Sequence, residues 1–114
     1  MPTPIWPAVT DETVRHLQAL LRLDTTNPPG NETLAANYIA GVLRAEGYEP
    51  LVLESAPGRG NVITRLKGAG DAPPLLLYCH TDVVSAEPKH WTHPPFAGQI
   101  ADGRRPLRHL AQPG

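Results

Sequence analysis

A histidine and an aspartate that could carry chemistry stand two positions apart, directly after the most apolar run of the chain. The run, 75–79, reads Leu-Leu-Leu-Tyr-Cys, and His80-Thr81-Asp82 follows it. In an extended backbone, side chains two positions apart lie on the same side. A neutral imidazole is a common zinc ligand, and a nearby carboxylate is the usual group that orients it. The pair is typical of a metal ligand with its orienting carboxylate, and also of a strand-end histidine bonded to backbone beside an aspartate that caps the next turn.

Three other histidines and the single cysteine are weaker candidates for a metal site or a nucleophile. His90 and His93 stand three apart, but two prolines follow His93 and argue against a helix that would align the two rings. We interpret them, and His109, as solvated loop residues, because residue type alone specifies metal ligands only loosely. Cys79 stands inside the apolar run, which predicts a buried, inert thiol.

Two helices precede this region. The first is predicted from an N-cap at Thr10 to about Leu23, because apolar residues recur at helical spacing and acidic residues fill its first turn. Prolines then predict an extended loop over 25–30. The second helix is expected to begin near Asn31 or Glu32 and to stop at Gly47.

Three strands are expected after the helices. Residues 51–53 and 61–66 predict two strands joined by a Pro- and Gly-rich turn, and the short connection favours an antiparallel pair. The apolar run 75–79 predicts a buried central strand covered on both faces. The order of elements indicates an α/β architecture, and His80 would stand at the carboxyl end of a strand, where open α/β folds bind ligands.

Three motifs in a fixed order extend this reading. They are T-N-P-P-G-x-E at 26–32, the apolar run with H-T-D-V-V at 75–84, and W-x-x-x-P-F at 91–96 followed by Asp-Gly at 102–103. Together they resemble the zinc peptidase and deacylase family that includes aminoacylase, acetylornithine deacetylase, succinyl-diaminopimelate desuccinylase and glutamate carboxypeptidase. The resemblance covers roughly residues 10–103.

The resemblance implies a role for two residues and a chemistry for the intact family. His80 matches the first zinc-ligating histidine, and Asp82 matches the acidic residue that supports the site. In that family two zinc ions polarise an amide carbonyl and activate a bridging water, while a glutamate acts as general base. The implied fold is a zinc-exopeptidase-like catalytic domain, and the implied substrates are N-acyl amino acids and small peptides.

The family pattern breaks after Gly103. The expected G-R-G turn, the aspartate that bridges both metals and the Glu-Glu pair do not follow, and residues 104–114 are rich in Arg and Pro. We therefore expect 1–103 to be the N-terminal part of a truncated catalytic domain and 104–114 an aberrant, disordered tail. One histidine makes at most a weak partial zinc site, so we expect an inactive chain without the family's dimerisation domain. A frameshift or sequencing error near Gly103 is our hypothesis for the change.

Length, charge and cysteine content limit the size of the domain, its partners and its location. The 114 residues suit one small domain or part of a larger one, and the net charge of −1 favours neither nucleic acid nor a membrane surface as partner. No apolar run approaches the ~20 residues of a membrane-spanning helix. A single cysteine excludes an internal disulfide and fits a reducing compartment, so a cytoplasmic location is expected. The alternative to a hydrolase is a non-enzymatic interaction module that keeps part of the fold.

Overall fold

The computed structural model describes residues 2–101 and 103. They fall into two compact units, Thr25–Ser85 and the two segments Met1–Asp24 and Ala86–Gly114, and each unit is described by itself. The predictions for Asp102, for His109 and for the tail at 104–114 lie outside the described residues. Every predicted site residue before Asp102 is described.

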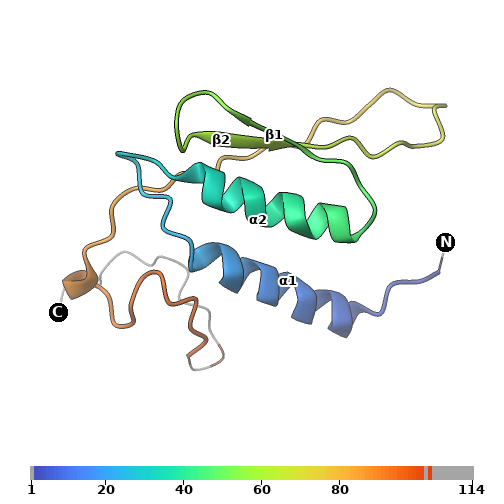
Figure 1. The fold of residues 1–114 in the computed structure, drawn as a ribbon. Coiled ribbons are helices and arrows are strands. Elements are labelled where there is room, and N and C mark those ends of the chain that lie inside the picture. Colours follow the sequence, from blue (N-terminus) through green and yellow to red (C-terminus); the bar gives the residue numbers. More distant parts are fainter. Residues whose placement is uncertain (1, 102, 104–114) are drawn as a thin grey trace. The chain divides into compact units, whose positions relative to one another are not determined.

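Helix α1, Trp6–Leu21, begins four residues before the predicted N-cap at Thr10 (Figure 1). Its first turn contains Pro7, which the pattern of apolar residues did not include. Proline is tolerated there because the first N–H groups of a helix have no intrahelical partner and its fixed φ suits a helix. No helix in the described part of the chain combines the length and apolar character needed to cross a membrane.

The loop after residue 86 is tied to the last turns of α1. Gln18 donates from Nε2 to the Gly98 carbonyl at 2.7 Å, and Arg22 donates from Nε to the Ala97 carbonyl at 3.2 Å. The short 3-10 helix η1, Pro88–His90, is the element found in this segment. The side chains of Gln18 in α1 and of its C-cap residue Arg22 thus hold a backbone segment that has little regular structure of its own.

Helix α2, Glu32–Ala45, confirms the second predicted helix, and Gly47 with φ 86° ends it as expected. The apolar residues that it buries are alanines, whereas Leu34 is exposed. Small side chains permit close approach of a neighbouring backbone. A β-carbon added to Gly60 would lie 2.8 Å from the Cα of Thr33, so strand β2 approaches the helix backbone where only glycine fits. The buried residues of α2 are Glu32, Ala35, Ala36 and Ala40.

Strands β1, Leu51–Glu54, and β2, Gly60–Ile63, form the predicted antiparallel pair, with β2 three residues shorter at its end than expected. Leu51 pairs with Ile63 and Glu54 with Gly60. Helix α2 packs along this hairpin, as Figure 1 shows. The hairpin and the N-terminus of α2 are also joined by the Thr33 hydroxyl, which donates to Glu54 at 2.6 Å.

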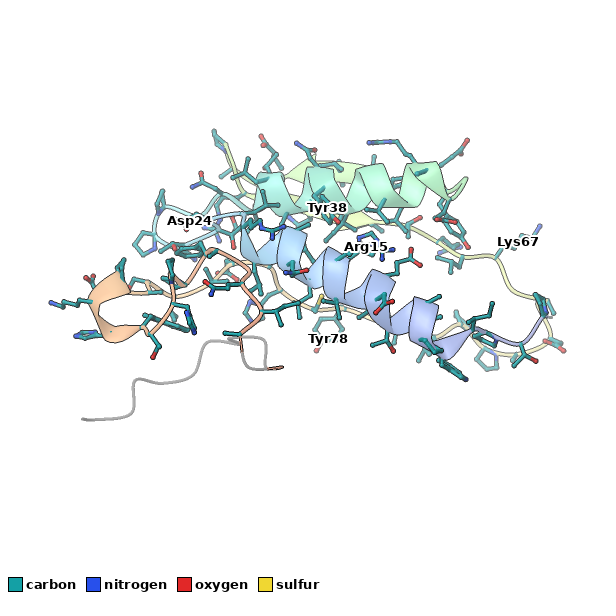
Figure 2. The ribbon with its side chains drawn as sticks, turned by 90° about the horizontal axis from the view of Figure 1, so that it is seen from below. Arg15, Asp24, Tyr38, Lys67 and Tyr78 are labelled. Carbon is teal, nitrogen blue, oxygen red and sulfur yellow. The ribbon has the colours of Figure 1, made fainter. Side chains whose placement is uncertain are left out.

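The prediction of a buried central strand over 75–79 is wrong. This stretch has no regular structure, and the side chains of Leu75 to Tyr78 are between 81% and 90% exposed. Tyr78, labelled in Figure 2, lies on a part of the ribbon drawn as plain coil. A strand requires a neighbour to complete its backbone hydrogen bonds. Among the described residues the sheet consists of β1 and β2, and neither strand pairs with this stretch.

Cys79 shares this exposure, which corrects the prediction of a buried thiol. Because access to the thiol controls its modification, the native chain should react with a chromogenic disulfide reagent such as Ellman's reagent without denaturant, at a rate close to that of the urea-unfolded chain. Stopped-flow absorbance would measure both rates. A reaction that needs denaturant would show that the apolar run is covered in solution.

Candidate functional site

Two segments that are far apart in the sequence meet within the Thr25–Ser85 unit. Thr26 and Val83 form a parallel bridge. The Val83 N–H donates to the Thr25 carbonyl at 3.1 Å, and the Val83 carbonyl accepts from the Asn27 N–H at 2.8 Å. The backbone thus places the N-P-P-G turn beside the H-T-D segment, which are two of the motifs in the sequence pattern.

The side chain of Thr25 adds a further hydrogen bond between these two segments. Its hydroxyl donates to the Thr81 carbonyl at 2.6 Å, and the residue is buried. A buried polar group is stable only when it is hydrogen-bonded, and here the bond satisfies the Thr25 hydroxyl. The bonded carbonyl belongs to the residue between His80 and Asp82, so the bond fixes the backbone on which both candidate site residues stand.

The structure brings His80 and Asp82 together as the spacing predicted. The Nδ1–H of His80 donates to Oδ1 of Asp82 at 2.9 Å and to the Asp82 backbone carbonyl at 3.0 Å. A carboxylate oxygen can only accept, so the proton is on Nδ1. The His80 side chain is 85% exposed, which leaves Nε2 presented to the outside of the unit.

Asp82 is held as a carboxylate by its neighbours. The hydrogen bond from the Asn27 amide, and after it the bond from His80, lower the pKa of Asp82 below its ordinary value, against a smaller opposing effect of burial. Hydrogen bonds to the charged form favour it. At neutral pH Asp82 is therefore ionised and able to accept from both donors.

Asn27 is a member of this site that the sequence analysis left without a role. Its Nδ2 donates to Oδ2 of Asp82 at 3.0 Å across 55 positions of the sequence. The N-P-P-G segment, interpreted from the sequence as a loop with a structural turn and no chemistry, does form a turn, closed by the Gly30 N–H on the Thr26 carbonyl at 2.8 Å. The signal was present, since this motif and H-T-D belong to one pattern, but spacing along the chain does not reveal a contact.

An ion pair between the half-exposed Arg59 and the buried Glu32 also holds the segment that follows the N-P-P-G turn. Arg59, in the β1–β2 turn, contacts Glu32 at the start of α2 through Nη2 at 2.7 Å and through Nε at 2.8 Å to each carboxylate oxygen. Glu32 is buried, and its bond raises the pKa of Arg59 further above the ordinary value. Such a fork-shaped pair is both strong and geometrically specific. It fixes the hairpin turn against the segment that leads into α2.

Gly30 stands where this ion pair leaves no room. Its φ is 82°, and a β-carbon there would lie 2.7 Å from Nε of Arg59 and 2.8 Å from Oε2 of Glu32. We expect Gly30→Ala to lower the free energy of unfolding by about 1–2 kcal/mol, since a left-handed conformation penalises a β-carbon and the pair must shift. Urea unfolding followed by circular dichroism measures the change.

Gly41 provides a matched control for this prediction. It lies in α2, and an added β-carbon meets nothing within 4 Å. Gly41→Ala should therefore raise the free energy of unfolding by about 0.5–1 kcal/mol, because alanine favours a helix. Equal effects of the two substitutions would show that the crowding at Gly30 is absent in solution.

The residues described contain no group of three His, Cys, Asp or Glu side chains that could hold a metal ion. His90 and His93 lie in the other unit, in and just after η1. Within the Thr25–Ser85 unit, hydrogen bonds join the side chains of His80, Asp82 and Asn27. Their arrangement can present one oriented imidazole nitrogen to a ligand.

No family model matches the chain. It is 42% identical over 89 residues to a succinyl-diaminopimelate desuccinylase of Methylobacterium sp. (strain 4-46), covering 75% of this chain and 22% of that protein. It is 36% identical over 89 residues to an enzyme of the same name from Methylorubrum extorquens, covering 75% and 23%. Aminoacylase-1 of Sus scrofa is 37% identical over 87 residues, covering 73% and 21%.

The chain thus spans less than a quarter of the length of the curated relatives it matches. The match to the first of these relatives covers about three quarters of the chain. Wherever a stretch of that length begins, it includes the middle half of the chain, and both His80 and Asp82 stand there.

Proposed function

We propose, on the premise that this segment belongs to the family of aminoacylase and succinyl-diaminopimelate desuccinylase, that it forms one part of the metal site of a hydrolase. The reaction is the hydrolysis of an amide bond in N-acyl amino acids or small peptides. The names of the relatives support this class, since both denote enzymes that act on acyl groups. The observation that carries the proposal is the bonded His80–Asp82 pair with its exposed ring nitrogen.

The donor set fits one ligand position of a zinc centre. Zinc binds a neutral imidazole through one nitrogen while the other nitrogen donates to a carboxylate or carbonyl. His80 meets this requirement, because Nδ1 is bonded to Asp82 and Nε2 remains for the metal. A catalytic zinc has about three protein ligands and a water. In our proposal the ligands other than His80 come from residues beyond those described.

Each residue then has a defined task. His80 binds through Nε2, and Asp82 keeps the proton on Nδ1 and the ring in one orientation. A zinc ion held in part by His80 would polarise the amide carbonyl and make a water nucleophilic near neutral pH. Asp82 supports the ligand and does not itself contact the substrate in this scheme.

A chimera tests the proposal with this chain's own residues. Residues 2–103 would replace the corresponding stretch of the Methylobacterium desuccinylase, and zinc content and hydrolysis of N-succinyl and N-acetyl amino acids would be measured. We expect the folded chimera to bind as many zinc ions as the parent and to hydrolyse at least one class of substrate. A folded chimera with less zinc and no hydrolysis would contradict the proposal.

A further inference from the structure

Both oxygens of the Asp82 carboxylate are occupied by donors from this chain. Oδ1 accepts from Nδ1 of His80 at 2.9 Å, and Oδ2 accepts from Nδ2 of Asn27 at 3.0 Å. Rotation of the carboxylate about its bond to Cβ would strain both hydrogen bonds together. The Asn27 amide therefore sets the plane in which Oδ1 meets the imidazole.

The His80 ring depends on this carboxylate for its orientation. Its side chain is 85% exposed, so little packing holds the ring. Its bonds go to the side chain and the backbone carbonyl of Asp82. A ring held in this way responds directly to any movement of Asp82.

Asn27 can act as a fixed donor because its own backbone is anchored. Its N–H donates to the Val83 carbonyl, and its neighbour Thr26 accepts from the Gly30 N–H, each at 2.8 Å. The anchor residue Val83 directly follows Asp82, so the amide and the carboxylate are tied to the same piece of backbone. An amide also donates without adding charge, so it does not offset the negative charge of Asp82 that faces the His80 ring.

We propose that Asn27 is a positioning residue, which holds the Asp82 carboxylate so that His80 keeps its proton on Nδ1 and presents Nε2. That Nε2 binds a metal rests on the proposed function. The effect of Asn27 on the tautomer and orientation of the His80 ring does not. Asn27 touches neither substrate nor metal in this scheme, and it acts through Asp82.

Nitrogen NMR of the His80 ring in the metal-free 114-residue chain tests this directly. The spectra would be recorded at about pH 8, and only the nitrogen signals of the neutral ring would be used to assign the tautomer. The wild type should show mainly the Nδ1–H form. Asn27→Ala removes the donor, and Asn27→Asp keeps the side-chain shape but places a carboxylate against a carboxylate. Both variants should shift His80 to a mixture of the two tautomers, and Asn37→Ala, at an exposed position of α2, should not.

A zinc titration of the chimera, in which the other metal ligands are present, separates the two proposals when it is followed on the same ring. If zinc perturbs Nε2 of His80, the apparent affinity should fall about tenfold in Asn27→Ala, the size typical of losing a group that orients a ligand. If zinc leaves the ring unperturbed while the tautomer still depends on Asn27, positioning stands and the metal proposal fails. Mixed tautomers in the wild type, or an unchanged Nδ1–H form in both Asn27 variants, would overturn the positioning role.

Discussion

Replacing His80 by alanine in the chimera should remove one zinc ion and lower kcat/KM for the hydrolysis of N-acyl amino acids by at least about a thousandfold. The imidazole is the residue that we assign as a direct metal ligand, and its Nε2 is presented with the ring already oriented by Asp82. Loss of a ligand removes the metal that polarises the carbonyl, so the effect should appear in kcat as well as in metal content. Atomic emission for zinc and steady-state kinetics on N-succinyl substrates measure both.

His90 and His93 provide matched controls for this prediction. Both are histidines of the same chain, and both lie in the other unit, in and just after η1. Alanine at either position should leave zinc content at the level of the unsubstituted chimera and change kcat/KM less than about threefold, as expected for residues outside the metal site. If His93→Ala lost as much zinc as His80→Ala, our assignment of His80 as the metal ligand would be contradicted.

Replacing Asp82 by alanine should have the second largest effect, a loss of about 10- to 100-fold in zinc affinity and a comparable fall in kcat/KM at limiting zinc. The carboxylate accepts from His80 and from Asn27, and without it the ring loses both its tautomer and its orientation. The zinc should still bind, since the imidazole ligand is retained. Competition with a chromogenic chelator measures the affinity.

The recovery of activity by added zinc distinguishes this variant from the loss of the ligand itself. Saturating zinc should restore much of the activity of Asp82→Ala and none of that of His80→Ala. Asp71→Ala, which removes an exposed carboxylate from an irregular loop, should leave zinc affinity unchanged. A wild-type affinity in Asp82→Ala would show that the hydrogen bond to His80 does not orient a ligand.

Helix α2 and the hairpin could be predicted from the sequence because their signals are local. A helical repeat of apolar residues followed by Gly47 defines α2, and a glycine-rich turn between short apolar runs defines the β1–β2 pair. The N-cap of α1 was placed five residues late, at Thr10, because the actual N-cap Ile5 has no capping side chain that would mark it in the sequence.

The error at 75–79 has a different cause. An apolar run indicates that its residues could be buried, but it contains no information on which neighbour would cover them. In the described residues the run pairs with no strand, and its side chains face solvent. Exposed apolar stretches are typical of association surfaces in general, and this one is the observation on which the alternative of an interaction module rests.

The candidate site was predicted only in part for a similar reason. His80 and Asp82 stand two positions apart, so their pairing followed from backbone periodicity. Asn27 lies 55 positions from its partner, and Glu32 lies 27 positions from Arg59. Contacts of this range depend on how the turn and hairpin fold together, which the pattern of residue types does not specify.

The most direct test of the central claim is the crystal structure of the chimera with diffraction data collected at the zinc absorption edge. We expect an anomalous peak about 2.1 Å from Nε2 of His80, with Nδ1 still bonded to Asp82. A zinc ion bound through Nδ1, or zinc sites occupied with His80 outside their coordination shells, would contradict the claim that this segment supplies a metal ligand.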